Sequence, residues 1–162
     1  MDIKNCTPVL FVRDAQKARN FYEGILGLTV VGDFGGLNIM FKERFALWQI
    51  MDENIIPRTL GKEEILNSSR ASRFELVFET ENLDKIYTEL KAQNVEFLHE
   101  INEELWGQRT IRFYDPDGHL VEVGEAMHVF VRRVYEAEGK NIEAAAKKMY
   151  MEPEILRQIL GL

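Results

Sequence analysis

The sequence contains the same pattern of elements twice, and this duplication constrains the fold more than any other feature. The segment TPVLFVRDAQKARNFYEGILGLTVV begins at Thr7, and ELVFETENLDKIYTELKAQNVEFL begins at Glu75. Each segment opens with a short apolar strand and then has a residue suited to cap a helix, Asp14 or Asn82. A helix with apolar residues at helical spacing follows, and a second strand ends the segment. Each half therefore predicts a strand–helix–strand unit.

Both halves continue with a second recurring piece, which is a strand, a tight connection and another strand. NIMFKERFALWQI in the first half matches TIRFYDPDGHLVEVG in the second half. Each half thus reads as a βαβββ module, and two such modules predict an α+β fold. We place the modules at about residues 5–51 and 73–126, within a domain of residues 1–126. The polar segment 52–72, which contains a proline and a glycine, is the expected linker.

Residues 127–162 lie outside the duplicated unit and predict a tail of three helices. Apolar residues at helical spacing begin at Met127 and indicate an amphipathic helix that ends at Gly139. Asn141 is suited to cap a second helix, and Pro153 to begin a third. A helix-turn-helix is one interpretation of this pattern. We favour a helical tail that packs on the domain or forms a dimer interface.

Composition and charge limit the classes of partner. The chain has 162 residues with 46% hydrophobic content, which suits one globular domain with a small appendage. Its formal net charge of −7 repels phosphate backbones, so no nucleic-acid partner is expected. No apolar run approaches the ~20 residues that span a bilayer, and the start MDIKNC lacks signal-peptide features. The single cysteine, Cys6, favours a reducing compartment. We therefore expect a cytoplasmic protein without a membrane partner.

One carboxylate stands out in the stretch RFYDPDGHLVEVGE, residues 112–125. The DPDG motif reads as a turn, and its alternating flanks predict a β-hairpin. If Tyr114 faces His119 across the turn, Ile111 pairs with Glu122, and Glu122 is a single acid on an apolar sheet face. Burial of an unpaired carboxylate is costly, so Glu122 needs water, a partner or a function.

The duplication gives Glu122 three polar counterparts. It aligns Thr7 with Glu75 at the start of the first strands, and Gln49 with Glu122 in the last strands. Trp48, next to Gln49, is expected to face the other way, toward a helix. If the modules pack around a pseudo-twofold axis, the four polar side chains converge in one cavity. Solvent exposure of the acids and a structural hydrogen bond for Gln49 are the alternatives.

The paired modules resemble a known superfamily. FYEGILGLTVV in the first half and WGQRTIRFYDPDGHLVEV in the second resemble the vicinal-oxygen-chelate superfamily over about residues 5–126. That superfamily includes glyoxalase I, bleomycin-resistance proteins, fosfomycin-resistance enzymes and extradiol dioxygenases. The resemblance implies that the two modules form a cupped mixed sheet, with metal ligands on the first and last strands of each module in the metal enzymes. By analogy with the family, we expect a homodimer.

The resemblance also places four ligand positions, which fall on Thr7, Gln49, Glu75 and Glu122. Glyoxalase I-like proteins use His or Gln, Glu, His and Glu there, so only Glu122 keeps the expected residue type. Zinc, nickel and iron sites favour imidazole, which these positions lack, whereas carboxylate and amide oxygens suit magnesium or manganese. A divalent metal on Glu75, Glu122 and Gln49 is therefore a candidate cofactor that the ligand set does not favour.

Two further side chains are candidates for ligand binding. In the superfamily the segment around Trp106 lies near the cavity mouth, where an aromatic ring could stack on a ligand. A core anchor is the alternative for this tryptophan. Arg109 or Arg112 could neutralise an anionic ligand or pair with an acid, and a surface salt bridge is the alternative.

Three functional hypotheses follow. The first is a glyoxalase-like small-molecule enzyme, a lyase or isomerase with a degenerate metal site, in which Glu122 and Glu75 are catalytic as acid and base or as weak metal ligands. The second is a non-enzymatic protein of the bleomycin-resistance kind that binds a drug or metabolite. The third is an interaction module that works through the tail helices.

Overall fold

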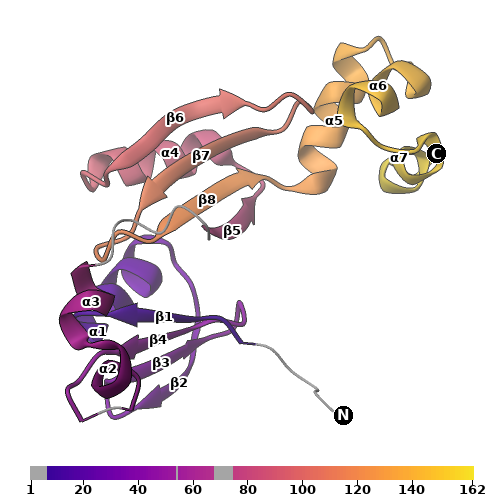
Figure 1. The fold of residues 1–162 in the computed structure, drawn as a ribbon. Helices are drawn as coiled ribbons and strands as arrows, with labels where there is room; N and C mark the ends of the chain where they lie inside the picture. Colours follow the sequence, from indigo (N-terminus) through magenta and orange to yellow (C-terminus); the bar gives the residue numbers. More distant parts are fainter. Residues whose placement is uncertain (1–6, 54, 68–74) are drawn as a thin grey trace, which may run out of the picture. The chain divides into compact units, whose positions relative to one another are not determined.

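Two four-stranded mixed sheets with their helices make up the fold (Figure 1). The structure is a computed structural model, and it describes residues 7–53, 55–67 and 75–162. Cys6 and positions 68–72 of the expected linker lie outside the described residues. The α+β class, the two modules and the carboxy-terminal helices predicted from the sequence are confirmed. Each module forms its own open mixed sheet.

The first module forms a sheet with strand order β1-β4-β3-β2, in which β1 is parallel to β4 and the other neighbours are antiparallel. Asp14 caps the first helix, since its carboxylate accepts the N–H groups of Gln16 and Lys17 at 2.9 and 3.0 Å. The elements are β1 (Val9–Val12), α1 (Ala15–Arg19), the π-helix η1 (Asn20–Ile25), β2 (Val30–Phe34), β3 (Asn38–Phe41) and β4 (Ala46–Gln49).

Helices α1 and η1 cover one face of this first sheet. Tyr22 of η1 is fully buried, and its ring centroid lies 5.8 Å from that of Phe41 and 5.1 Å from that of Phe45. Because alternate residues of a strand share a face, Ile39 lies on the same side as Phe41. Its partner Leu47 on β4 is also fully buried. The face that contains Leu47 is therefore the helix-covered face.

The second module repeats this order as β5-β8-β7-β6, with β5 parallel to β8. Asn82 caps its helix by accepting the N–H of Lys85 at 3.0 Å, as the sequence predicts. Phe97 links helix to sheet, because its ring contacts both Tyr87 and Phe113. The elements are β5 (Glu75–Thr80), α4 (Leu83–Ala92), β6 (Phe97–Glu103), β7 (Arg109–Tyr114) and β8 (Leu120–Glu125).

The register of the β7–β8 hairpin differs by one residue from the predicted register. Asp115 and His119 close the hairpin, because the Asp115 N–H donates to the His119 carbonyl at 3.0 Å. The connection is therefore a three-residue loop that ends at Gly118, whose φ of +87° suits the left-handed last position of such loops. Arg112, not Ile111, lies opposite Glu122. The prediction of a single acid on an otherwise apolar face is wrong.

Helices form the linker and the tail. The linker contains α2 (Ile55–Leu60) and α3 (Lys62–Asn67). The tail contains α5 (Met127–Ala137), α6 (Ile142–Met149) and α7 (Pro153–Leu160), with Asn141 as the cap of α6 and Pro153 at the start of α7, as predicted. The tail has its own hydrophobic core, whose fully buried members include Val131, Ala145 and Leu156.

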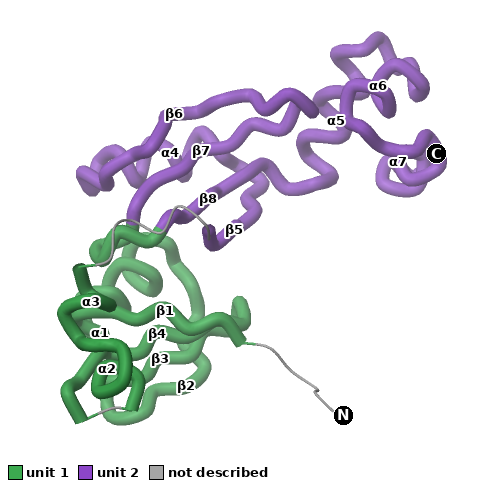
Figure 2. Tube along the Cα trace, in the orientation of Figure 1, with its two compact units in different colours: residues 1–74, 115–119 green, residues 75–114, 120–162 purple. Residues whose placement is uncertain are grey.

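The chain divides into two compact units, drawn in different colours in Figure 2. Unit 1 comprises residues 1–74 and 115–119, and unit 2 comprises residues 75–114 and 120–162. The hairpin tip belongs to unit 1, in which the Tyr22 hydroxyl donates to the buried carboxylate of Asp115 at 2.9 Å. No helix of the described residues has the length and apolar character needed to cross a membrane.

Candidate functional site

A charged cluster lies on the face of the unit 2 sheet opposite α4. Alternation along β8 places Val121 and Val123 in the core beneath α4 and turns Glu122 to the other, open face. Arg112 on β7 lies directly opposite Glu122 on this face. The guanidinium of Arg112 is the centre of the cluster, and we call its surrounding groups the carboxylate cluster. These groups are the side chains of Glu75, Glu104, Glu122 and His99.

Arg112 contacts each of the three glutamates of the carboxylate cluster with a different nitrogen of its guanidinium. Nε donates to Glu75 Oε2 at 3.1 Å, and Nη1 donates to Glu104 Oε1 at 2.7 Å. Nη2 forms an ion pair with Glu122 Oε2. The structure thus brings Glu75 and Glu122, two of the four side chains expected to converge, together within unit 2, with an arginine between them.

His99 is the fourth partner of Arg112, and its contact with the Glu100 carbonyl assigns its tautomer. His99 Nδ1 lies 2.7 Å from the Glu100 carbonyl oxygen, which can only accept a hydrogen bond. Nδ1 therefore carries the hydrogen in this arrangement. His99 Nε2 is left as an acceptor for Arg112 Nη1, at 3.2 Å. His99 thus contacts the cluster through its Nε2 atom.

Glu122 is the most deeply buried acid of the cluster. Its side chain is 8% exposed, against 33% for Glu75 and 17% for Glu104. Burial raises the pKa of Glu122, Glu75 and Glu104 raise it further, and the Arg112 guanidinium opposes them. Among the described residues its Oε2 makes no hydrogen bond beyond the ion pair. Glu122 is therefore the acid of the cluster that most readily holds a proton.

The other charges of the cluster are more firmly fixed. The hydrogen bond from Arg112, opposed by burial, lowers the pKa of Glu104. Burial lowers the pKa of Arg112, but its bonds to Glu104 and Glu75 outweigh this and raise the pKa overall. Arg112 is therefore a permanent cation. Three carboxylates surround one guanidinium, so negative charge is in excess in the cluster, and ionisation of Glu122 increases that excess.

Gln49 does not share the sheet face expected for a counterpart of Glu122. Gln49 lies two residues after Leu47 on β4 and therefore shares the helix-covered face of the unit 1 sheet. Its Oε1 accepts the Ala15 N–H of α1 at 2.9 Å. Trp48 lies on the open face instead, where its ring centroid is 6.2 Å from that of Phe11. The expectation that Trp48 faces a helix is wrong, because the sequence alignment of the last strands is shifted by an odd number of residues.

Glu125 is the residue of unit 2 that corresponds to Gln49. Gln49 pairs with Val12, two residues before the capping residue of α1. Glu125 pairs in the same way with Thr80, two residues before the capping residue of α4. Thr7, the remaining predicted position, is exposed and precedes β1 in unit 1. Ligand binding by Thr7 and Gln49 stays a prediction.

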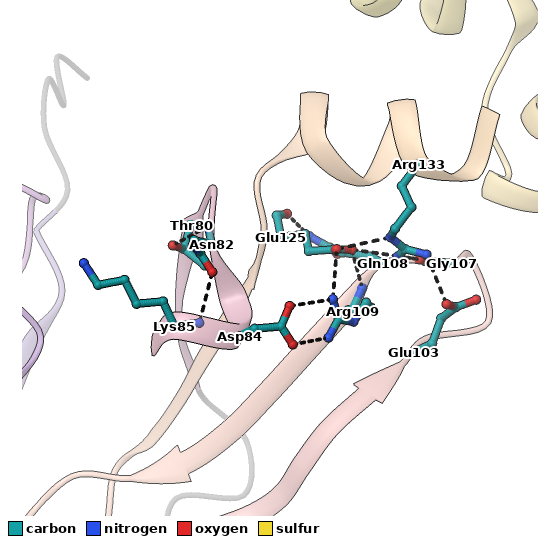
Figure 3. Close-up of polar contacts among 10 residues, drawn as sticks. All are labelled: Thr80, Asn82, Asp84, Lys85, Glu103, Gly107, Gln108, Arg109, Glu125 and Arg133. Atoms are coloured by element: carbon teal, nitrogen blue, oxygen red, sulfur yellow. Dashed lines mark hydrogen bonds and ion pairs between the residues drawn. The ribbon is translucent and has the colours of Figure 1, made fainter. Parts of the chain in front are cut away.

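Arg109 lies beside Glu125 (Figure 3), on the face of β7 opposite Arg112. Trp106 is linked to the Glu125 backbone through the side chain of Gln108. The Arg109 guanidinium donates two hydrogen bonds to the Asp84 carboxylate, at 2.6 and 3.0 Å. Trp106 Nε1 donates to Gln108 Oε1 at 3.1 Å, and its ring packs against the core of the tail. Both positions match the structural alternatives, and their roles in ligand binding stay predictions.

Sequence reasoning missed Glu104 and His99, and it gave Arg112 no definite role. Glu104 follows the end of β6, and His99 lies between two irregularities in the β6–β7 pairing. Simple alternation from β7 therefore could not place either residue. The position of Arg112 could have been found, because a glycine three residues after Asp115 is typical of a three-residue hairpin loop.

The residues do not fit the metal that the fold implies. Among residues 7–53, 55–67 and 75–162, no group of three or more His, Cys, Asp or Glu side chains is arranged to hold a metal ion. Glu75, Glu104 and Glu122 face a guanidinium that already neutralises part of their charge. Gln49 Oε1 is engaged by a backbone N–H. A metal site on Glu75, Glu122 and Gln49 therefore has no support in these contacts.

Comparison with known proteins agrees with the fold. Residues 5–128 match the family model described as a glyoxalase-like domain. A crystal structure of a protein of unknown function from Agrobacterium tumefaciens strain C58 is 34% identical, with a TM-score of 0.62 over 78% of this chain and 97% of that chain. Two more distant structures share the fold. They are a lactoylglutathione lyase from Agrobacterium tumefaciens (20% identity, TM-score 0.53, 76% and 93% covered) and a fosfomycin resistance protein from Listeria monocytogenes (19%, 0.56, 78% and 96%).

Proposed function

Because this chain belongs to the glyoxalase-like domain family of the vicinal-oxygen-chelate superfamily, we propose that it acts on a small polar molecule at the carboxylate cluster of unit 2. Members of this superfamily include lyases, transferases and resistance proteins. We propose a lyase or isomerase whose chemistry is acid–base transfer by Glu122 and whose site contains no resident divalent metal.

The burial of Glu122 is the observation that carries this proposal. A carboxyl group whose pKa is raised above its ordinary value is a stronger base than an ordinary carboxylate and keeps its proton to a higher pH, which suits it to general acid–base catalysis. Burial raises the pKa of Glu122, while Arg112 limits the cost of its ionised form. In this proposal Glu122 removes a proton from carbon beside a carbonyl group and returns it to the neighbouring atom. Glu75, which is more exposed, orients the substrate through Arg112.

A second candidate function is sequestration of a small molecule without turnover. The number of bonds that Arg112 makes favours this function. Three carboxylates fix the guanidinium in place, so a ligand can bind to a pre-organised surface without any residue that reacts with it. The two functions share the same face of the sheet. They differ in whether a bound molecule is converted.

The proposal can be tested with probes whose chemistry the related structures name. Purified protein is treated with a chelator and incubated with S-lactoylglutathione or with fosfomycin, and binding of each is measured by calorimetry. Only S-lactoylglutathione has a C–H group beside a carbonyl group, so its conversion, followed as released glutathione by mass spectrometry, tests the proton transfer. We expect S-lactoylglutathione to bind and its conversion to survive the chelator. Binding without conversion would support sequestration instead.

Variants connect the result to the cluster. Glu122→Gln should abolish conversion, whereas Glu79→Gln, which changes an exposed acid of the neighbouring strand β5, should leave it unchanged. Full activity of Glu122→Gln would overturn the acid–base role. Activity that the chelator abolishes and manganese restores would overturn metal independence.

A further inference from the structure

The family's metal chemistry and this chain's residues disagree at the carboxylate cluster, and from this disagreement we infer that Arg112 is the resident cation of the site. It neutralises part of the charge of the carboxylates in place of a divalent ion and excludes such an ion from the wild-type protein. The inference deepens the proposed function and rests on it only for the location of the site. It predicts that the chain loses its selectivity against divalent ions when the guanidinium is removed.

The first support is the number and direction of the contacts. Arg112 directs Nε, Nη1 and Nη2 to three different glutamates, and Nη1 also reaches His99. Only 20% of the Arg112 side chain is exposed. A divalent ion at this place would need to displace a permanent cation from its charged hydrogen bonds, which are stronger than neutral ones.

The second support is the chemistry of the groups that would remain without Arg112. Glu75, Glu104 and Glu122 would offer carboxylate oxygens, and His99 would offer the imidazole nitrogen that now accepts from Arg112. Carboxylates with one imidazole form a donor set that suits manganese or zinc. In the wild-type protein the guanidinium lies between these carboxylate oxygens and the His99 nitrogen. It therefore keeps them too far apart to bind one ion together.

The third support is a comparison with the other arginine of β7. Arg109 lies on the opposite face of the sheet and makes its charged hydrogen bonds to the exposed Asp84. The nearby Glu125 carboxylate keeps Arg133 as its partner whether or not Arg109 is present. Removal of Arg109 therefore leaves no comparable set of unneutralised acids, and Arg109→Ala is a matched control.

The test is a titration of the chelator-treated full chain with manganese alone, followed by calorimetry and by the electron paramagnetic resonance signal of free manganese. We expect weak binding to the wild type and to Arg109→Ala. Arg112→Ala should bind one ion per chain with a dissociation constant at least about tenfold lower. The double variant Arg112→Ala with Glu122→Gln should lose most of this gain.

Two further measurements keep the test decisive. Millimolar guanidinium ion should compete with manganese for Arg112→Ala, because it refills the place of the missing side chain. If Arg112→Ala does not fold by circular dichroism, Arg112→Met keeps the aliphatic stem and serves in its place.

Three results would overturn the inference. They are stoichiometric manganese binding by the wild type that Glu122→Gln removes, no gain in the folded Arg112 variant, and an equal gain in Arg109→Ala. No small-molecule probe enters this titration. A failure of S-lactoylglutathione and fosfomycin to bind would therefore count against the proposed function and would not affect the inference about Arg112.

Discussion

Two buried acids on β8, only three residues apart, have different environments. Glu122 and Glu125 are 6% and 4% exposed and point to opposite faces of the same sheet. The Glu125 carboxylate accepts the Arg109 backbone N–H at 3.0 Å and two hydrogen bonds from Arg133, at 2.7 and 3.2 Å (Figure 3). Glu122 has the ion pair with Arg112, and burial raises its pKa. Burial alone therefore does not distinguish a structural acid from a candidate reacting acid.

The difference lies in what each acid holds together. Arg133 belongs to α5 and also donates to the Gly107 carbonyl and to Glu103, so Glu125 ties the tail to the β6–β7 connection. The ion pair of Glu122 joins it to Arg112, its neighbour on the same face of the sheet. Fully bonded buried polar groups specify structure, whereas a buried acid with fewer bonds and a raised pKa is a candidate for function. Variants at both positions can test this distinction.

We expect the largest effect from loss of the structural acid. Glu125→Ala leaves the Arg109 N–H without its acceptor and removes two of the hydrogen bonds of Arg133, and it should lower the free energy of unfolding by about 3 kcal/mol. Denaturant titration followed by circular dichroism measures this value. Glu136→Ala on the exposed side of α5 is the control, with a change of less than about 0.5 kcal/mol. A loss at Glu125 no greater than that of the control would remove the distinction.

A glycine in the same region should have the next largest effect. Gly107 has a φ of +92°, and an added Cβ would lie 2.8 Å from Val134 Cγ2 of α5. Gly107→Ala should therefore cost about 2 kcal/mol or more, from backbone strain and from displacement of the tail. Gly139→Ala shares the positive φ but has open space around it, so its cost should be only about 1 kcal/mol. Equal thermal shifts for the two variants would argue against close packing of the tail.

Gln49 tests the corresponding position of unit 1. If it is the counterpart of Glu125, its task is to accept the Ala15 N–H at the start of α1. Gln49→Ala should then lower the free energy of unfolding by about 1 kcal/mol. Gln16→Ala, an exposed change in the first turn of the same helix, is the comparison in the same denaturant titration. An unchanged stability of Gln49→Ala would return this residue to the list of candidate ligand contacts.

Glu122 should give the smallest change in stability, with the opposite sign. Because its pKa is raised in the folded protein, the folded state binds the proton more tightly than the unfolded state, and stability falls as the pH rises through the raised pKa. Glu122→Gln should therefore be more stable than the wild type at neutral pH, by about 0.5–1 kcal/mol. Thermal melts should show this gain disappear as the pH falls below the ordinary pKa of a glutamate. A gain independent of pH would contradict the role of burial.

Much of the fold could be predicted from the sequence, and the candidate site only in part. The caps Asp14 and Asn82, the start of α7 at Pro153 and the βαβββ repeat depend on local signals, and the structure contains them. The sequence predicted that Glu75 and Glu122 would be among four converging polar side chains, but it did not predict the arginine between these two acids. Its position depends on a single residue of hairpin register, and a shift of one residue moves every side chain to the other face.

By itself the sequence determined where strands and helices begin, because capping residues, left-handed turn positions and apolar periodicity act over a few neighbouring residues. Only the tertiary structure decided that Gln49 supports a helix, that Glu125 holds the tail and that Glu122 meets Arg112 on an open face. These assignments join residues that are distant in the chain. The free energy of a buried charge depends on the partners that the fold brings to it, and no local pattern records them.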